Sequence, residues 1–184
     1  MILRHVSVLD PTWTSAIPNI YAVQTATSAK AASALNKSLP PERTAPLNVL
    51  LQVNTSEEEA KSGLSAITST ESALGSELVQ LAQHIITNCP RLRFHGLMTI
   101  GSLTETLASD ERPNADFETL KRTRDFLEQV LRQDPTSGSK WGVDGKLLLS
   151  MGMSGDFEAA LKGGSDIVRV GTGIFGARPT KDQR

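Results

Sequence analysis

The sequence predicts an α/β fold that forms part of a (β/α)8 barrel of the TIM type, covering about strands 4 to 8 with their helices. Five short apolar, strand-like segments alternate strictly with helical ones, a pattern typical of parallel strands joined by helical crossovers. The last two strand segments each run into a turn of Gly, Ser and Thr, as such barrels do where they bind phosphate. The third observation is length, because 184 residues leave room for only part of an eight-unit barrel.

The first half of the chain predicts three strands and two helices. Ser28 is a suitable N-cap for a helix rich in Ala and Leu, which Leu39-Pro-Pro41 ends. The strand that follows is apolar at nearly every position, which indicates that both of its faces are covered, as in a parallel sheet. Leucine and isoleucine then recur at helical spacing until Pro90. The predicted elements are a strand at 19–24, a helix at 29–38, a strand at 47–54, a helix at 69–88 and a strand at 94–100.

The second half predicts two helices and two strands around an insertion. Residues 134–145 contain Pro, Ser and Gly, and we expect them to form a flexible insertion. A short helix is stopped by Gly163-Gly164. The predicted elements are a helix at 116–133, a strand at 146–151, a helix at 157–162 and a strand at 167–170. The domain boundaries that follow are an irregular lead segment at 1–18, a partial barrel domain at 19–178 and a charged tail at 179–184.

Composition narrows the class of protein. The net charge of −1 gives no electrostatic reason to expect a nucleic-acid partner or an acidic membrane surface. The chain has no apolar run of the roughly 20 residues that a membrane span needs. Cys89 is its only cysteine, which excludes an internal disulfide and suits a reducing compartment. We therefore expect a cytoplasmic protein, with a mitochondrial location as the alternative.

The candidate site residues follow the last two strands. Ser154, Gly171 and Thr172 lie in the two polar turns, where backbone N–H groups and hydroxyls from adjacent turns could close around a phosphate. Ser154 has the alternative role of a simple helix N-cap. Arg169 lies inside an apolar strand, so its side chain is expected to reach either a carboxylate or a ligand. No histidine has a carboxylate or cysteine at metal-ligand spacing, so we predict no metal site. The sequence has no Gly-x-Ser-x-Gly elbow and no P-loop, and we predict no catalytic residue.

The chain also resembles the pyridoxal phosphate homeostasis protein family, single-domain relatives of the alanine racemase N-terminal barrel. The matching motifs occur in order from about residue 19 to residue 178. They are Gln52-Val-Asn-Thr-Ser56 with Lys61-Ser-Gly-Leu64, Gly96-Leu-Met98, Leu149-Ser-Met-Gly-Met-Ser154, and Val168-Arg-Val-Gly-Thr172 with Ile174-Phe-Gly-Ala-Arg178. The resemblance implies that Ser154, Gly171 and Thr172 hold the 5′-phosphate of pyridoxal 5′-phosphate (PLP), and that Arg169 faces its pyridine nitrogen. It further implies a non-catalytic role in intracellular PLP homeostasis, with PLP enzymes lacking their cofactor as possible partners.

One departure from the family pattern affects the expected chemistry. The family's aldehyde-binding lysine lies at the end of the second barrel strand, and the sequence shown is expected to begin after that point. No lysine here matches that position, so we expect an N-terminally truncated protein that keeps the phosphate-binding turns without the covalent anchor. Two alternatives remain open, which are a PLP-dependent amino-acid racemase and a truncated fragment that binds nothing. A racemase needs a lysine and an acid/base group at the cofactor ring.

Overall fold

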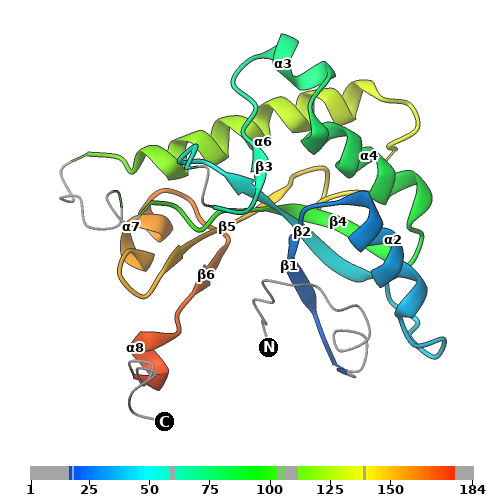
Figure 1. Ribbon diagram of the computed structural model, residues 1–184, viewed down its shortest axis with the longest axis horizontal. Coiled ribbons are helices and arrows are strands. Elements are labelled where there is room, and N and C mark those ends of the chain that lie inside the picture. The colour runs from blue at the N-terminus through cyan, green and yellow to red at the C-terminus, as the bar shows by residue number, and fades with distance from the viewer. Residues whose placement is uncertain are drawn as a thin grey trace.

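The computed structural model describes residues 17, 19–58, 61–102, 105, 112–138 and 140–176 (Figure 1). Apart from Ile17, the predicted lead segment lies outside the described residues, as does the predicted tail. Strands and helices alternate as the sequence predicts. In chain order they are β1 (Ala22–Ala26), α2 (Ala29–Ser38), β2 (Leu47–Asn54), β3 (Leu64–Ser65), α3 (Thr70–Leu74), α4 (Glu77–Asn88), β4 (Leu92–Met98), α6 (Ala115–Gln133), β5 (Leu148–Met153), α7 (Phe157–Lys162), β6 (Ile167–Arg169) and α8 (Thr172–Phe175).

The strands form one parallel, curved sheet. Its order is β1-β2-β4-β5-β6, and every neighbouring pair is parallel, so the predicted strand order is confirmed. The two-residue strand β3, which the sequence did not predict, pairs with the end of β2. The curvature is visible in one contact, because the Ser150 hydroxyl on β5 reaches the Gln24 side chain on β1 at 2.7 Å although β2 and β4 lie between these strands. The sheet is therefore a partial barrel.

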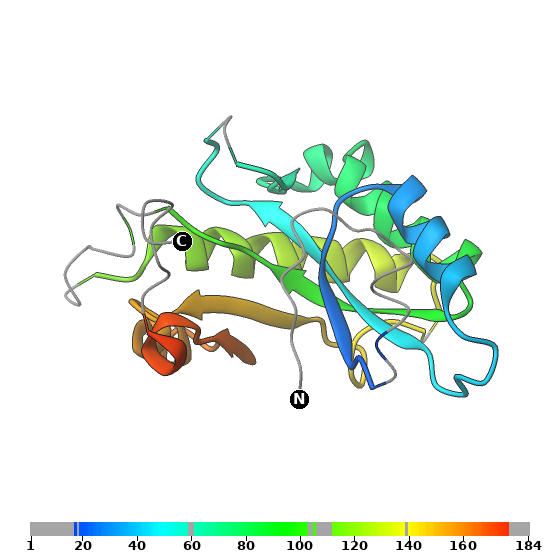
Figure 2. The same ribbon diagram turned by 60° about the horizontal axis from the view of Figure 1, so that its bottom comes forward.

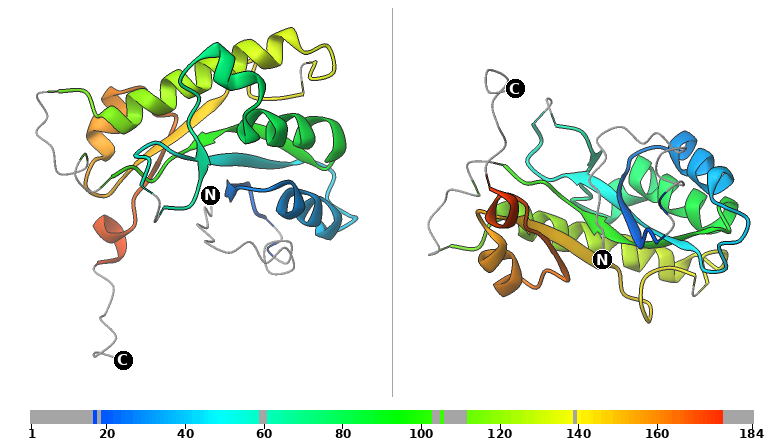
Figure 3. Two further views of the ribbon diagram at one scale, coloured as in Figure 1. Left: turned by 45° about the horizontal axis from the view of Figure 1, so that its top comes forward. Right: turned by 90° about the horizontal axis from the view of Figure 1, so that it is seen from below.

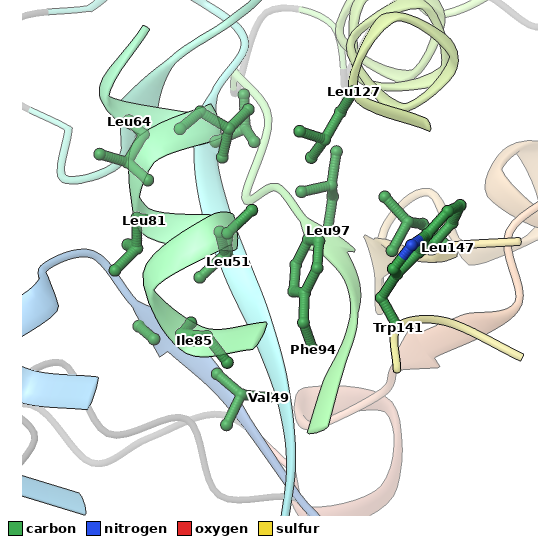
Figure 4. Close-up of a cluster of buried hydrophobic side chains, with 14 of the residues drawn as sticks. Val49, Leu51, Leu64, Leu81, Ile85, Phe94, Leu97, Leu127, Trp141 and Leu147 are labelled. Carbon is green, nitrogen blue, oxygen red and sulfur yellow. The ribbon is translucent and has the colours of Figure 1, made fainter. Parts of the chain in front are cut away.

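The helices cover the convex face of this sheet. Helices α4 and α6 lie along it, and α2 packs against α4 (Figures 2 and 3). The main hydrophobic core lies between these helices and the strands, and Figure 4 shows Ile85 of α4 beside Val49 of β2. Within the described part of the chain, no helix is long and apolar enough to cross a membrane.

The concave face is chemically different from the convex face. Leu50, which lies between Val49 and Leu51, points away from the main core, as alternation along a strand requires. With Ala22 and Met98 it forms a small second apolar cluster. Polar side chains lie on the same face, among them Gln24, which bonds across it to Ser150. An inner face that mixes apolar and polar groups leaves hydrogen-bonding groups available inside the partial barrel.

Two expectations about segments were wrong. The single helix predicted at 69–88 is broken, because Ser69 caps α3 and Ser76 caps α4, each through a side-chain bond to the backbone N–H three residues on. The segment 134–145, predicted to be a flexible insertion, is held against the sheet. Trp141 is buried, and the Gly142 N–H donates to the Phe94 carbonyl of β4 at 2.8 Å. The buried indole supplies an anchor that the surrounding Pro, Ser and Gly residues obscured in the sequence.

His95 on β4 is a buried histidine whose two ring nitrogens have no hydrogen-bond partner. Its ring meets Tyr21 edge to face at a centroid distance of 6.2 Å. Burial lowers the pKa of His95 below its ordinary value of 6.5, and the nearby Arg93 charge lowers it further. The neutral imidazole is therefore the form that the folded protein favours.

This burial predicts a loss of stability in mild acid. The His95 imidazole takes up a proton near pH 6.5 in the unfolded chain and only at lower pH in the folded chain. The stability that the neutral His95 contributes is therefore fully present above pH 6.5 and is lost as the pH falls. Between pH 7.5 and 5.5 we expect the free energy of unfolding to fall by about 1 kcal/mol more in the wild type than in His95→Leu. Urea unfolding at both pH values measures this difference, and equal pH dependence in the two proteins would contradict it.

Candidate functional site

Two turns meet at the carboxyl-terminal edge of the sheet. Ser154 follows β5, and the Gly171-Thr172 turn follows β6. The Ser154 Oγ accepts the backbone N–H groups of Gly171 at 3.0 Å and of Gly173 at 3.2 Å. The structure thus brings Ser154, Gly171 and Thr172 together at one edge. Thr172 is exposed there and begins α8, which projects from the body of the molecule in Figure 1.

The alternative role of Ser154 as a helix N-cap is wrong. The residue at the N-cap of α7 is Asp156, and the Ser154 side chain instead bonds to the turn after β6. The hydroxyl oxygen occupies the point where two backbone N–H groups converge, which is the position that an oxygen of an anionic ligand would take. The Ser154 hydroxyl proton is directed away from both donors and remains available to an acceptor.

The turn after β5 is fixed by its backbone and by Asp156. Gly152 has φ +88°, a conformation that favours glycine. A Cβ at this position would lie 2.4 Å from the Ala160 Cβ, so α7 packs directly on the Gly152 backbone. The Asp156 carboxylate accepts the Met153 N–H at 2.6 Å, which closes the turn. Ser154 is therefore held by a rigid strand–turn–helix unit.

Arg169 reaches across the concave face beside these turns. Its Nη1 donates to the Ser150 Oγ at 2.7 Å and to the Ser150 carbonyl at 3.0 Å, and its Nη2 donates to the Thr99 carbonyl at 2.5 Å. Among the described residues it forms no ion pair, so the internal salt bridge considered as its alternative partner is not found there. Burial lowers the pKa of the Arg169 guanidinium to about 10, while the charge of Asp156 acts in the opposite direction. The group stays protonated at neutral pH and acts only as a donor.

The residues in the hydrogen-bond network of Arg169 were not predicted from the sequence. Ser150 is completely buried on β5, Thr99 follows β4, and Gln24 lies on β1. The available signal was a polar residue within an apolar strand, as in Leu148-Leu-Ser-Met151. Nothing in the sequence indicated that the Ser150 side chain on β5 meets the Gln24 side chain on β1.

A cavity of about 300 Å³ opens at the same edge of the sheet, beyond the ends of β1, β2 and β4. It does not include the candidate site residues, but Thr99, which accepts the Arg169 bond, lies in its wall. Its lining is mostly hydroxyl, amide and backbone groups. The lining residues are Thr25, Thr27, Gln52, Val53, Asn54, Thr55, Ser56, Lys61, Ser62, Thr99, Ile100 and Gly101.

Lys61 is the lysine in this lining. Its ammonium group donates to the Glu58 carboxylate at 2.7 Å, to the Gly101 carbonyl at 2.6 Å and to the Ser56 hydroxyl at 3.4 Å. The hydrogen bond from Lys61 lowers the pKa of Glu58. The lysine charge is balanced inside its own loop, so the cavity wall is polar with little net charge. In the part of the chain that the structure describes, no cluster of three His, Cys, Asp or Glu side chains could hold a metal ion.

Comparison with known families identifies the fold. The family profile of the alanine racemase N-terminal domain matches residues 2–179 of the chain. The chain belongs to the alanine racemase N-terminal domain family. This agrees with the parallel partial barrel and with the two turns that meet after β5 and β6. Within this family, the motif resemblance to the pyridoxal phosphate homeostasis proteins is also confirmed by curated relatives of that name.

Two such relatives of this chain are the pyridoxal phosphate homeostasis proteins of Homo sapiens and Haemophilus influenzae. The human protein is 38% identical over 177 residues, which cover 91% of this chain and 56% of the human protein. The Haemophilus protein is 41% identical over 156 residues, which cover 85% of this chain and 56% of that protein. The chain thus spans little more than half the length of these relatives.

Solved structures support the same fold. A Bifidobacterium adolescentis protein of unknown function is 32% identical and superimposes with a TM-score of 0.60, covering 87% of this chain and 55% of that one. PipY of Synechococcus elongatus, solved with PLP bound, is 23% identical with a TM-score of 0.62, covering 93% of this chain and 68% of PipY. At that identity the PipY likeness shows the fold alone.

Proposed function

We propose that this protein binds PLP without catalysing a reaction of its own and serves in intracellular PLP homeostasis. The observation that carries the proposal is the convergence of the Gly171 and Gly173 N–H groups on the Ser154 hydroxyl, beside the half-buried side chain of Arg169. Backbone N–H groups and hydroxyls are the donors that a phosphate accepts, and a phosphate oxygen would take the place that the Ser154 hydroxyl oxygen occupies here. The pyridoxal phosphate in the names of the curated relatives supports the choice of ligand.

In this proposal each residue has a separate task. Ser154, Gly171 and Thr172 hold the 5′-phosphate, and Arg169 donates a hydrogen bond toward the pyridine nitrogen. Because an arginine with a pKa of about 10 keeps its proton at neutral pH, the ring nitrogen is left unprotonated. Bound PLP supplies an aldehyde that condenses with amines and a ring that withdraws electrons, and an unprotonated ring withdraws them less. The site therefore favours holding the cofactor over carbanion chemistry.

The alternatives predict different measurements. A PLP-dependent racemase would interconvert D- and L-amino acids when PLP is added, whereas a carrier would bind PLP and give it up to a PLP enzyme that lacks its cofactor. A fragment that binds nothing would do neither. We separate the three by calorimetric titration with PLP, a racemisation assay, and reactivation of a PLP enzyme that lacks its cofactor.

The buried Cys89 forms no disulfide, which suits a reducing compartment, and we place the protein in the cytoplasm.

The phosphate role of the turn predicts the effect of Thr172→Val. Removing the hydroxyl should weaken binding of PLP and of inorganic phosphate alike by about 1–3 kcal/mol, the usual cost of leaving a polar partner unsatisfied. Thr87→Val is the matched control, because the Thr87 hydroxyl bonds only to its own helix, at the Gln83 carbonyl. Phosphate affinity that is unchanged in Thr172→Val would remove Thr172 from the site.

The expected lack of the anchor lysine predicts that the 184-residue chain holds PLP reversibly. After reduction with borohydride, mass spectrometry should find sparse label scattered over exposed lysines such as Lys30 and Lys37. Stoichiometric label on a single lysine would overturn this expectation and point to an anchor elsewhere. Lys61, which lines the cavity, would be the first position to examine.

A further inference from the structure

Gln24 carries a buried donor that has no partner. Among the described residues, the buried side-chain nitrogens without a hydrogen bond are the Gln24 Nε2, both ring nitrogens of His95 and the Trp141 Nε1. Of these, only Gln24 belongs to the hydrogen-bond network of Arg169. Gln24 is 2% exposed, so its amide has lost water as a partner. Buried unsatisfied groups in native structures call for a specific explanation.

The donor and acceptor roles in the hydrogen bonds from Arg169 to Ser150 and from Ser150 to Gln24 determine which end of the Gln24 amide has no partner. Arginine has donors and no acceptor, so the Ser150 Oγ must accept from Arg169. The remaining Ser150 proton is then donated to the Gln24 Oε1, at 2.7 Å. In the reversed orientation, the Gln24 Nε2 and Arg169 would both donate to the Ser150 Oγ, and the hydroxyl proton would lose this acceptor. The Nε2 group is therefore the free end.

The same chain of bonds makes this free donor stronger. The Arg169 charge polarises the Ser150 hydroxyl, which in turn polarises the Gln24 carbonyl, and hydrogen bonds linked in this way reinforce one another in a low-dielectric interior. An amide whose oxygen accepts such a bond is a better donor at its nitrogen. A strengthened donor is best matched by an oxygen that carries negative charge.

We propose that the Gln24 Nε2 is a second point of ligand recognition on the concave face and donates to the ring hydroxyl oxygen of the bound pyridine, which binds in its ionised form and releases its proton to solvent. This rests on the proposed function. The phosphate oxygens of such a ligand are assigned to the turns of Ser154 and Gly171, and its ring nitrogen to Arg169. The phenolate oxygen is the remaining anionic acceptor on the ring. Gln24 thus selects a 3-hydroxypyridine over a pyridine without that oxygen.

Two ligands and two substitutions test this assignment. Pyridoxine 5′-phosphate has the ring hydroxyl and no aldehyde, so lysine chemistry does not enter, and its analogue with hydrogen in place of the ring hydroxyl is the comparison. The wild type should bind the hydroxyl-bearing compound about tenfold or more tightly. Gln24→Glu keeps the acceptor for Ser150 but removes the donor, and Gln24→Met removes both. Both variants should bind the two compounds with nearly equal affinity, so that the discrimination is lost.

The controls separate failure of this inference from failure of the proposed function. Gln80→Glu makes the same change on the exposed face of α4 and should leave the discrimination intact. If the wild type binds neither compound, the proposed function and this inference fall together. If the wild type discriminates and Gln24→Glu does so equally, Gln24 is not the recognising group and the PLP proposal stands.

A measurement on the wild type keeps the test decisive if the Gln24 variants fold poorly. In a ¹H–¹⁵N spectrum, the Gln24 side-chain NH₂ resonance should shift downfield on addition of pyridoxine 5′-phosphate, because its proton enters a charge-assisted bond. It should shift much less with the hydroxyl-free analogue. Equal shifts with the two compounds would overturn the assignment.

Discussion

Gly96→Ala should destabilise the protein by about 3 kcal/mol or more, or prevent folding altogether. A Cβ at Gly96 would lie 2.0 Å from the Leu148 carbonyl oxygen and 2.8 Å from two further backbone atoms of that residue. Gly96 and Leu148 are partners in the pairing of β4 with β5. Since the clash is with the backbone of a neighbouring buried strand, no side-chain rotation relieves it, and the two strands must move apart.

The same substitution should also impair the site. The Thr99 N–H bonds to the Ser150 carbonyl across β4 and β5, and Arg169 donates to both the Thr99 and the Ser150 carbonyls. Separating the strands would spread the acceptors of Arg169. Gly75→Ala is the matched control, because its Cβ would meet nothing within 4 Å and its φ is −111°. Urea unfolding compares the two, and a Gly96→Ala protein as stable as Gly75→Ala would contradict the described strand pairing.

Arg169→Met should reduce affinity for PLP by about 2–3 kcal/mol, roughly 30- to 150-fold, and should affect inorganic phosphate much less. The expected loss is that of a charge-assisted bond to the pyridine nitrogen, which inorganic phosphate does not have. Folding stability should change little, because the folded protein already disfavours this buried charge, as its pKa of about 10 indicates. The variant thus separates binding from stability.

Titration calorimetry with PLP and with phosphate, alongside urea unfolding, measures all three quantities for Arg169→Met. Arg124→Met on α6 is the control, because the Arg124 partner is the adjacent exposed Asp125. An equal loss of affinity for PLP and for phosphate would mean that Arg169 acts on the phosphate group. A large loss of folding stability would mean that its bonds to Ser150 and Thr99 are mainly structural.

Strand and helix positions were predictable where burial alone determines them. The nearly continuous apolar run at 47–54 became β2 with the predicted bounds, and the Ser28-capped helix became α2, also as predicted. The apolar pattern gave the wrong prediction where one side chain, a capping serine or a buried tryptophan, determined the local structure. Ser76 has a side chain that caps a new helix after Gly75, so two helices replaced the single predicted one. Trp141 likewise fixed a segment whose other residues predicted a flexible insertion.

The site residues divide in the same way. Ser154, Gly171 and Thr172 could be proposed from sequence because each follows a strand, and parallel strands end at a common edge. The hydrogen bonds from the Gly171 and Gly173 N–H groups to Ser154 are seen only in the tertiary structure. The same holds for the backbone carbonyls that accept from Arg169, where the sequence had suggested a carboxylate or a ligand. These contacts depend on the register between strands, which the polarity of single residues does not encode.

The sequence by itself determined the alternation of strands and helices, the parallel order and the two polar turns, because these follow from local periodicity and from the rules of helical crossovers. The tertiary structure alone decided how strongly the sheet curves. Gln24 and Ser150 are 126 positions apart, and they meet because that curvature brings β1 opposite β5 across the concave face. A contact of this range depends on the twist of the strands between them and on the register shifts in the β1–β2 and β2–β4 pairings, and no segment of the chain carries that information alone.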